Sequence, residues 1–282
     1  MKSFDNKVAA ITGAGSGIGR ALALQLAEEH CHLALSDINL DSVKETAELA
    51  KKKGVKVVAT KLDVADKKAV EAWANKTQEE FGKVNLIFNN AGVAQAGTVS
   101  ETSMEDYEWL MGINFWGVLY GTKAFLPLLK QSGEGHVVNI SSIFGLFSQP
   151  GMSAYNASKF AVRGLTESLR QELDLEKCGV SATSIHPGGI RTNIAKSARM
   201  DESMSQVAGG DTSADALRNK FDEFLLRTTP EKAAQVILSG VKRNARRVLI
   251  GADASAVDTM QRLLPQGYQK IVSTSMKLLR FG

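Results

Sequence analysis

A tyrosine and a lysine are the two residues of this sequence best placed for proton chemistry. Tyr155 and Lys159 stand four positions apart in a segment whose apolar pattern predicts a helix, which puts both side chains on one face. A free tyrosine has a pKa of about 10, too high for a base at neutral pH. A neighbouring ammonium stabilises the phenolate and lowers that pKa. A Tyr-x3-Lys spacing often occurs by chance. The alternative interpretation is that both side chains are exposed on a helix and take no part in chemistry.

A serine pair ends a predicted strand upstream of this helix. Ser142 could hydrogen-bond a substrate oxygen there, and Ser141 is the less favoured candidate. The carboxyl ends of parallel strands form the edge at which open α/β sheets bind ligands. We therefore expect Ser142 to lie near Tyr155 and Lys159, above that edge.

Three glycines follow the first predicted strand. Gly13, Gly17 and Gly19 have the spacing Gly-x3-Gly-x-Gly. Glycines let a backbone turn tightly and approach a pyrophosphate, and the amides at the start of the following helix attract its charge. A glycine-rich turn alone is a weak signal, because many are only tight turns. Its place after the first strand of an alternating chain predicts cofactor binding.

The second predicted strand ends at Asp37, eighteen residues after Gly19. A carboxylate there can accept hydrogen bonds from both ribose hydroxyls, and it repels a 2′-phosphate. No arginine or lysine follows at positions 38 or 39 to receive such a phosphate. The sequence therefore favours NAD over NADP; the alternative is that Asp37 only begins a turn or caps the next helix.

Short apolar runs alternate with longer amphipathic segments along the chain. The runs are rich in Val, Ile, Ala and Leu without strict alternation, which suits parallel strands buried on both faces. The predicted strands are Lys7–Thr12, His32–Ser36, Lys56–Leu62, Val84–Phe88, His136–Ile140, Ser181–Ile185 and Arg247–Ile250. The predicted helices are Gly17–Glu29, Leu40–Lys53, Lys67–Phe81, Glu105–Gln131, Ala154–Lys177 and Glu231–Arg243. This order predicts an α/β protein with a three-layer Rossmann fold, a doubly wound parallel sheet of seven strands.

No repeat or flexible linker divides the chain, so we expect a single NAD(P)-binding Rossmann domain over residues 1–282. Residues 193–229 begin polar and become amphipathic, which predicts a small helical lid inserted over the substrate. Residues 252–282 form an amphipathic C-terminal extension that mixes apolar side chains with cations. We expect this extension to pack on the body or on a neighbouring subunit; peripheral membrane contact is the alternative.

Charge, cysteine and histidine content exclude several classes of function. The 282 residues are 44% hydrophobic and 23% charged, which is ordinary for a globular protein. The net charge of +4 arises in residues 242–282, where eight Lys and Arg face two Asp, so no nucleic-acid-binding body is predicted. Cys31 and Cys178 are expected to be free thiols in a reducing cytoplasm. The His30–His32 run has no second cluster to complete a metal site, and His136 and His186 are expected only to pack. We expect no signal peptide, membrane span or metal.

Taken together, these residues resemble the short-chain dehydrogenase/reductases. The matching motifs stand in that family's order and spacing over about residues 5–251: Thr12-Gly13-x3-Gly17-Ile18-Gly19, Asn89-Asn90-Ala91-Gly92, Asn114, Ser142, Tyr155-x3-Lys159 and Pro187-Gly188. Ser142 stands thirteen residues before Tyr155, as the family pattern requires. The resemblance implies an NAD(P) cofactor and hydride transfer between that cofactor and an alcohol/carbonyl pair.

The resemblance also implies roles for individual residues. Tyr155 would exchange the alcohol proton, Ser142 would orient the substrate oxygen, and Lys159 would tune Tyr155 and bind the nicotinamide ribose. Asn114 would support a water that links Lys159 to solvent. The implied cofactor-binding residues are Gly13, Ser16, Gly17, Ile18, Gly19, Asp37, Asp63, Val64, Asn90, Ala91, Gly92, Tyr155, Lys159, Pro187, Gly188, Ile190 and Thr192.

The predicted substrate pocket is apolar. Its lining would come from Val93, Ile143, Phe144, Phe147, Met152, Met200, Met204, Leu217 and Phe221. Such a lining favours a hydrophobic secondary alcohol or ketone over a sugar or an acidic metabolite. We therefore expect a cytoplasmic, NAD-dependent alcohol dehydrogenase or ketone reductase. The resemblance to the family also implies assembly as a homotetramer or homodimer.

Two other functions remain open at this point. One is a non-catalytic NAD-binding sensor or scaffold, against which the complete set Asn114, Ser142, Tyr155 and Lys159 argues, because a sensor needs no proton relay. The other is an epimerase or dehydratase of the same superfamily, which can share the Tyr-x3-Lys pair. Those enzymes usually have a different glycine spacing and a larger C-terminal substrate domain.

Overall fold

One parallel sheet organises the molecule. The computed structural model describes residues 1–192, 194, 197–204 and 228–278. Seven strands lie in the order β3-β2-β1-β4-β6-β7-β9, all parallel. They are β1 (Val8–Thr12), β2 (His32–Asp37), β3 (Val57–Lys61), β4 (Leu86–Asn89), β6 (Gly135–Ile140), β7 (Val180–Pro187) and β9 (Arg247–Ile250). The chain leaves β1 first toward β2 and β3 and then, from β4, in the opposite direction. This confirms the predicted doubly wound Rossmann fold.

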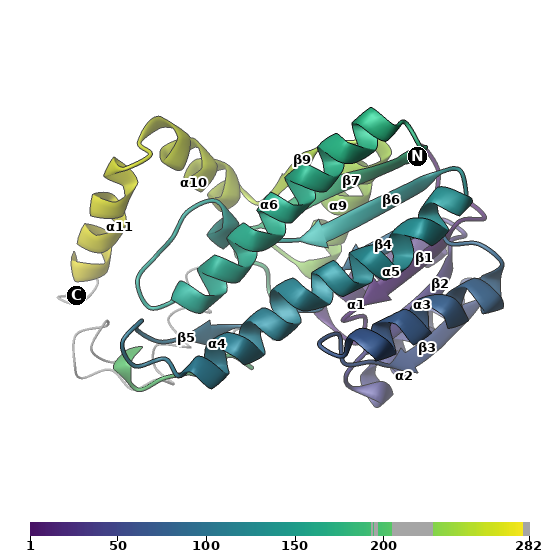
Figure 1. Ribbon diagram of the computed structural model, residues 1–282, viewed down its shortest axis with the longest axis horizontal. Helices are drawn as coiled ribbons and strands as arrows, with labels where there is room; N and C mark the ends of the chain where they lie inside the picture. Colours follow the sequence, from purple (N-terminus) through teal and green to yellow (C-terminus); the bar gives the residue numbers. More distant parts are fainter. Residues whose placement is uncertain (193, 195–196, 205–227, 279–282) are drawn as a thin grey trace.

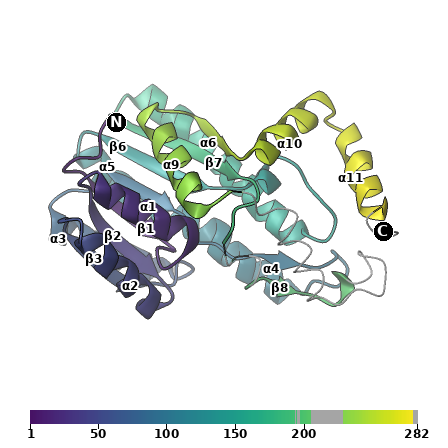
Figure 2. The same cartoon turned by 180° about the vertical axis from the view of Figure 1, so that it is seen from behind.

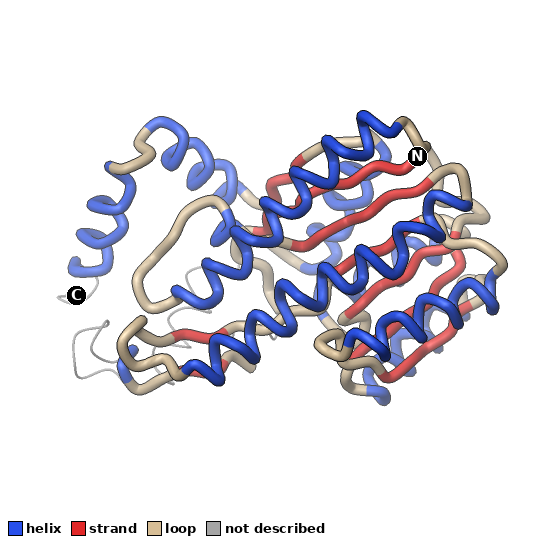
Figure 3. Tube along the Cα trace, in the orientation of Figure 1, coloured by secondary structure: helices blue, strands red, loops and turns tan. Residues whose placement is uncertain are grey.

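Helices cover both faces of this sheet (Figures 1 and 2). One layer holds α1 (Gly17–Glu28), α2 (Leu40–Lys51) and α9 (Pro230–Lys242). The other holds α3 (Lys67–Phe81), α5 (Gly117–Gln131) and α6 (Ser153–Glu176). Ile11 of β1 pairs with Leu35 of β2 and with Phe88 of β4, and all three side chains are fully buried. The continuous apolar runs of the sequence are therefore strands covered on both sides, as Figure 3 shows.

Local signals set several helix ends. Asp66 precedes α3 and its carboxylate accepts a hydrogen bond from the Ala69 amide at 3.1 Å. The Thr229 hydroxyl oxygen accepts a hydrogen bond from the Lys232 amide at 3.2 Å, and Pro230 lies in the first turn of α9. Gly82 ends α3 with a φ of 72°, a left-handed conformation that favours glycine. These ends follow from the caps and glycines that the sequence displays.

The prediction of one continuous helix over residues 105–131 is wrong. The structure divides it into α4 (Met104–Met111), a π-helical turn η1 (Gly112–Trp116) and α5. The wide turn directs Asn114 into the core, where its Oδ1 accepts from the Val93 amide at 2.8 Å and its Nδ2 donates to the Val93 carbonyl at 2.9 Å. A π turn inside a helix often marks a functional site.

The C-terminal extension forms α10 (Ala252–Leu263) and α11 (Gly267–Leu278), which lie beyond the carboxyl ends of the strands (Figure 1). Ala254 and Tyr268 are buried against the body, whereas Leu263 is 74% exposed. A two-stranded sheet of β5 (Gln95–Ala96) and β8 (Arg199–Met200) lies at the same end. Most of the predicted lid, including Leu217 and Phe221, lies outside the described residues. The helices that the structure describes include none that is long and apolar enough to span a membrane.

Candidate active site

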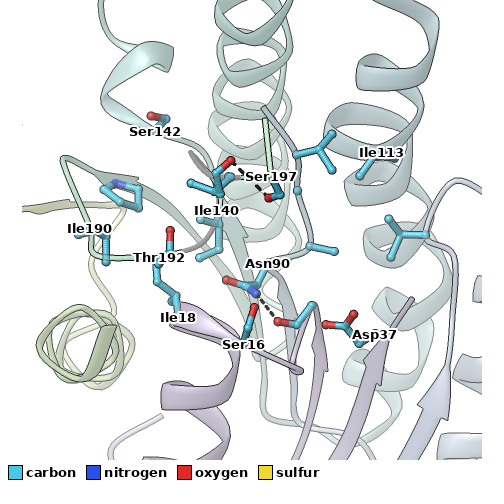
Figure 4. A pocket seen from close by; sticks show the side chains of 18 of the residues that line it. Ser16, Ile18, Asp37, Asn90, Ile113, Ile140, Ser142, Ile190, Thr192 and Ser197 are labelled. Carbon is cyan, nitrogen blue, oxygen red and sulfur yellow. Dashed lines mark hydrogen bonds between the residues drawn. The ribbon is translucent and has the colours of Figure 1, made fainter. Parts of the chain in front are cut away.

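A groove of about 330 Å³ brings the predicted site residues together at the carboxyl ends of the strands. It is lined by Gly13, Ser16, Gly17, Ile18, Asp37, Ile38, Leu62, Asp63, Val64, Asn90, Ala91, Gly92, Val93, Ile113, Ile140, Ser141, Ser142, Tyr155, Lys159, Pro187, Gly188, Ile190, Thr192, Ile194 and Ser197. Every cofactor residue implied by the resemblance is present except Gly19, and every catalytic residue except Asn114. Figure 4 shows Asp37 and Ser142 toward opposite ends of the groove, with Ser16, Ile18 and Asn90 between them.

Several lining residues were missed from the sequence. They are Ile38, Leu62, Ile113, Ile140, Ser141, Ile194 and Ser197. Ile38 is 62% exposed and directly follows Asp37. Its position at the carboxyl end of a strand could have indicated that it lines the groove. Ile113 belongs to the π turn, which no periodicity reveals.

The glycine turn fits a pyrophosphate. Gly13 and Gly17 have φ angles of 65° and 51°, in the left-handed region that glycine tolerates. Ser16 is the N-cap of α1, and its hydroxyl caps no amide of that helix, which leaves the amides and the hydroxyl facing the groove. Gly19 has a packing role instead, because a Cβ there would overlap the carbonyl oxygen of Gly13.

Asp37 is held in place at the far end of the groove. Its Oδ2 accepts from the Gly15 amide at 2.9 Å and its Oδ1 from the Asn39 amide at 3.0 Å. Each oxygen keeps a further acceptor position for a ligand hydroxyl. At the same corner, Arg20 donates to the Gly15 carbonyl at 2.7 Å and pairs with Glu45.

Asn90 forms the wall between the two ends. Its Nδ2 donates to the carbonyl oxygens of Thr12 and Gly13 at 2.9 and 3.2 Å. The Thr12 hydroxyl oxygen in turn accepts from the amides of Asn90 and Ala91, both at 3.0 Å. These bonds join the end of β4 to the glycine turn and fix the depth of the groove.

Tyr155, Lys159 and Ser142 meet at the other end. The Lys159 Nζ lies 5.6 Å from the centre of the Tyr155 ring, and the Ser142 hydroxyl stands near the Tyr155 hydroxyl, whose pKa it lowers. Nζ also donates to the carbonyl oxygen of Ile140, the last residue of β6, at 3.0 Å. The face shared by Tyr155 and Lys159 therefore points into the groove rather than to open solvent.

The electrostatics of this pair differ from the expectation. Burial raises the pKa of Tyr155 to about 12, against a smaller lowering by the hydrogen bond to Ser142. Burial also lowers the pKa of Lys159 to about 8. The expected lowering of the tyrosine pKa is thus not produced by the protein alone, because desolvation dominates. At neutral pH the phenol is a proton donor.

Asn114 stands behind Lys159 rather than in the groove. A Cβ built on Gly92 would lie 3.2 Å from the Asn114 Oδ1 and 3.5 Å from the Lys159 Nζ, so one small space borders both side chains. The Asn114 Nδ2 also reaches the Ser158 hydroxyl at 3.3 Å. This position suits support of Lys159 without contact to a ligand.

Gly92→Ala tests that space. The added methyl would press on the Asn114 oxygen and crowd the Lys159 amine, so we expect kcat to fall about tenfold, because small displacements of catalytic groups are costly. Gly164→Ala is the matched control, because its Cβ would meet nothing within 4 Å on an exposed part of α6. We expect the control to keep full activity and gain about 0.5–1 kcal/mol in unfolding free energy. Equal activities for the two variants would refute the role of the space above Gly92.

An aromatic cluster packs against Tyr155. The Tyr155 ring meets Phe144 edge-on at 5.9 Å, Phe144 stacks on Phe147 at 5.4 Å, and Phe147 meets Tyr268 of α11 at 6.2 Å. Ile143 and Met152 are buried in the same cluster, and none of these predicted pocket residues is among those that line the groove. Of the other predicted lining residues, Val93 borders the groove, and Met200 and Met204 are half-buried. Tyr268 was missed, because its contact spans more than a hundred residues of sequence.

Comparisons with known proteins agree with this geometry. The family model described as short chain dehydrogenase matches residues 7–203. SadH of Mycobacterium tuberculosis, named as an oxidoreductase, is 47% identical over 276 residues, which are 98% of this chain and 97% of SadH. A short-chain dehydrogenase/reductase from Burkholderia phymatum, solved in complex with NAD, has a TM-score of 0.86 at 31% identity, covering 95% of this chain and 97% of that one. An alcohol dehydrogenase from Thermococcus sibiricus complexed with 5-hydroxy-NADP has a TM-score of 0.71 at 27% identity, covering 86% and 95%.

Proposed function

Because the chain belongs to the short-chain dehydrogenase/reductase family and is an oxidoreductase of it, we propose that it transfers a hydride between NAD(H) and a hydrophobic secondary alcohol or ketone. One observation carries this proposal: Tyr155, Lys159 and Ser142 converge in a groove whose other end fits a dinucleotide. A bound nicotinamide would supply or accept the hydride. The protein positions the substrate and the cofactor and supplies the proton.

The proton steps follow from the positions of these side chains. In reduction, the Tyr155 hydroxyl donates its proton to the carbonyl oxygen as that oxygen gains negative charge. The Ser142 hydroxyl, which stands near Tyr155, orients the same oxygen. In oxidation the proton returns to a phenolate, which the Lys159 ammonium stabilises. Asn114 borders the same small space at Gly92 as Lys159, where it would support a water that links Lys159 to solvent.

The proposed substrate class rests on the aromatic cluster beside Tyr155. Phe144 and Phe147 are buried and offer no charged or hydrogen-bonding group to a ligand. A sugar that reached this cluster would leave its hydroxyls unsatisfied, whereas an aliphatic, alicyclic or steroid-like ketone would give up only its contacts with water. Activity on a panel of apolar ketones and secondary alcohols, assayed with NAD(H) and NADP(H) in parallel, tests this. Turnover confined to polyols or sugars would contradict it.

Asp37 supports the choice of NAD over NADP. A 2′-phosphate in that corner would face a carboxylate already fixed by two backbone amides, and like charges a few ångströms apart repel by more than 1 kcal/mol even in a partly solvated site. Replacement of Asp37 removes the repulsion and exposes the phosphate to Arg20. The carboxylate therefore acts as the selecting group.

Asp37→Ser is expected to shift the ratio of kcat/KM for NADP to that for NAD at least tenfold toward NADP, by the same charge argument. The matched control is Asp41→Ser, which removes an exposed carboxylate from the first turn of α2 without touching the groove. The control should leave the ratio unchanged. A wild-type preference for NADP would contradict the assignment directly.

We also propose that residues 1–282 form one domain. In it, residues 193–229 are the substrate lid and the basic extension 252–282 packs on the body. Burial of Ala254 and the contact of Tyr268 with Phe147 support packing of the extension on the body. A homo-oligomer, tetrameric or dimeric, and a cytoplasmic location complete the proposal. Light scattering of the purified protein tests the assembly.

A further inference from the structure

A fully buried histidine lies behind Ser142. His186 is in β7, next to Pro187, with an exposed fraction of 0%. Its Nδ1 lies 3.0 Å from the backbone carbonyl oxygen of Ser142, and its Nε2 lies 2.9 Å from the hydroxyl oxygen of Ser184. The imidazole therefore links the end of β7 to the end of β6, directly under the groove.

The partners of the ring fix its protonation state. A carbonyl oxygen only accepts hydrogen bonds, so Nδ1 carries the proton. In a neutral ring Nε2 is then an acceptor, and the Ser184 hydroxyl donates to it. Burial lowers the pKa of His186 to about 4, and the nearby cations Arg163 and Lys159 act in the same direction, against Glu167 and the bond to Ser142. The imidazole is neutral throughout the physiological range.

Ser142 needs such a support. Its backbone stands where β6 ends and a short 3-10 turn (Ile143–Gly145) begins. Its hydroxyl oxygen accepts from the Phe144 amide at 3.2 Å, and the same hydroxyl lowers the pKa of Tyr155. Its carbonyl oxygen accepts from the Gly145 amide at 3.0 Å as well as from His186. The direction of the hydroxyl follows from the orientation of this peptide group.

We propose that His186, in its neutral Nδ1–H form, is a positioning residue that fixes the Ser142 backbone and thereby the Ser142 hydroxyl relative to Tyr155. This rests on the proposed function, in which Ser142 orients the substrate oxygen. His186 touches no substrate, and its effect passes through Ser142. A misplacement of that hydroxyl by a fraction of an ångström costs transition-state stabilisation.

Matched variants separate the hydrogen bond from the bulk of the ring. His186→Asn places an amide N–H where Nδ1–H stands, and we expect it to keep most of kcat. His186→Leu fills similar volume without a donor, and we expect kcat per cofactor-binding site to fall about 10–100-fold. Should the leucine variant fail to fold, His186→Gln, whose amide stands nearer the Nε2 position, replaces it with the same expected loss. If the asparagine variant and the leucine variant, or the glutamine variant in its place, had equal kcat values, the proposal would be overturned.

A double-mutant cycle with Ser142→Ala identifies the path of the effect. If His186 acts through Ser142, the leucine substitution has little further effect in the alanine background. Additive losses would overturn the inference but leave the proposed function standing. No loss in Ser142→Ala alone would contradict the role of Ser142 in the proposed function.

Nitrogen NMR of the His186 ring provides a readout that needs no turnover. We expect a protonated Nδ1 and a bare Nε2 from pH 5 to pH 9, roughly the range above the lowered pKa. The opposite tautomer, or a charged ring at pH 6, would overturn the proposal.

Discussion

Tyr155→Phe is expected to lower kcat by about 10²–10⁴-fold, the usual contribution of a positioned acid or base. The substitution removes one oxygen and leaves the ring that packs edge-on against Phe144. The Ser142 hydroxyl keeps its bond from the Phe144 amide. Alcohol-dependent NADH formation and ketone-dependent NADH consumption measure the loss in both directions.

Two controls make this result specific. Tyr120→Phe removes a hydroxyl from a ring on α5 that stacks on Trp116, outside the groove, and should leave kcat unchanged. The dissociation constant of NADH should change less than threefold in Tyr155→Phe, roughly the limit for a variant that keeps its fold and most cofactor contacts. Full turnover by Tyr155→Phe would remove the phenol from the mechanism. No turnover in the wild type across the panel would favour a cofactor-binding scaffold.

Lys159→Met is expected to have the second largest effect on the rate, again about 10²–10⁴-fold in kcat. The loss has two sources. The ammonium would no longer stabilise the Tyr155 phenolate, and the amine that borders the groove would lose the ribose contact that we propose for it. Lys123→Met, on the exposed side of α5, is the matched control and should keep wild-type kinetics.

The same variant is expected to be more stable than the wild type at pH 7. Burial lowers the folded-state pKa of Lys159 to about 8, whereas the unfolded chain titrates near its ordinary 10.5. Stability from this group is therefore present above pH 10.5 and is lost as the pH falls through about 8. Methionine removes the free-energy cost of the buried charge but also loses the hydrogen bond to Ile140. We expect a net increase in unfolding free energy of about 1–3 kcal/mol.

Chemical denaturation at several pH values checks this sign. The gain in unfolding free energy of Lys159→Met over the wild type should be largest below pH 8 and be lost by about pH 10.5, where only the missing bond to Ile140 still counts. Lys123→Met should show no such dependence. A methionine variant that is less stable than the wild type at pH 7 would mean that the amine is not desolvated as the structure indicates.

The sheet and the groove were predictable because their signals are local. Short continuous apolar runs between amphipathic segments are typical of strands covered on both faces, and Gly13 and Gly17 mark a turn that needs left-handed backbone. Tyr155 and Lys159 share a helix face by spacing alone. Asp37 follows from its place at the end of β2.

Other features depend on contacts between distant segments. Asn114 turns inward because it bonds to the backbone of Val93, which is 21 residues away in sequence, and helical periodicity cannot reveal that contact. The pKa of Tyr155 is raised by burial against a smaller lowering by Ser142, whereas the sequence indicated only the charge of Lys159. The link between His186 and Ser142 joins two strands through a single ring, where the sequence predicted only packing.

The most direct test is the ionisation of Tyr155 itself, followed by phenolate absorbance with Tyr155→Phe as the blank. Without cofactor the phenol should titrate at a pKa of about 12. With NAD⁺ bound beside Lys159, the positive charges should lower that pKa by at least about two units, toward the range in which a phenolate can accept a proton from an alcohol. A phenol that titrates at the same pH with and without NAD⁺ would contradict its use as the acid and base of this enzyme.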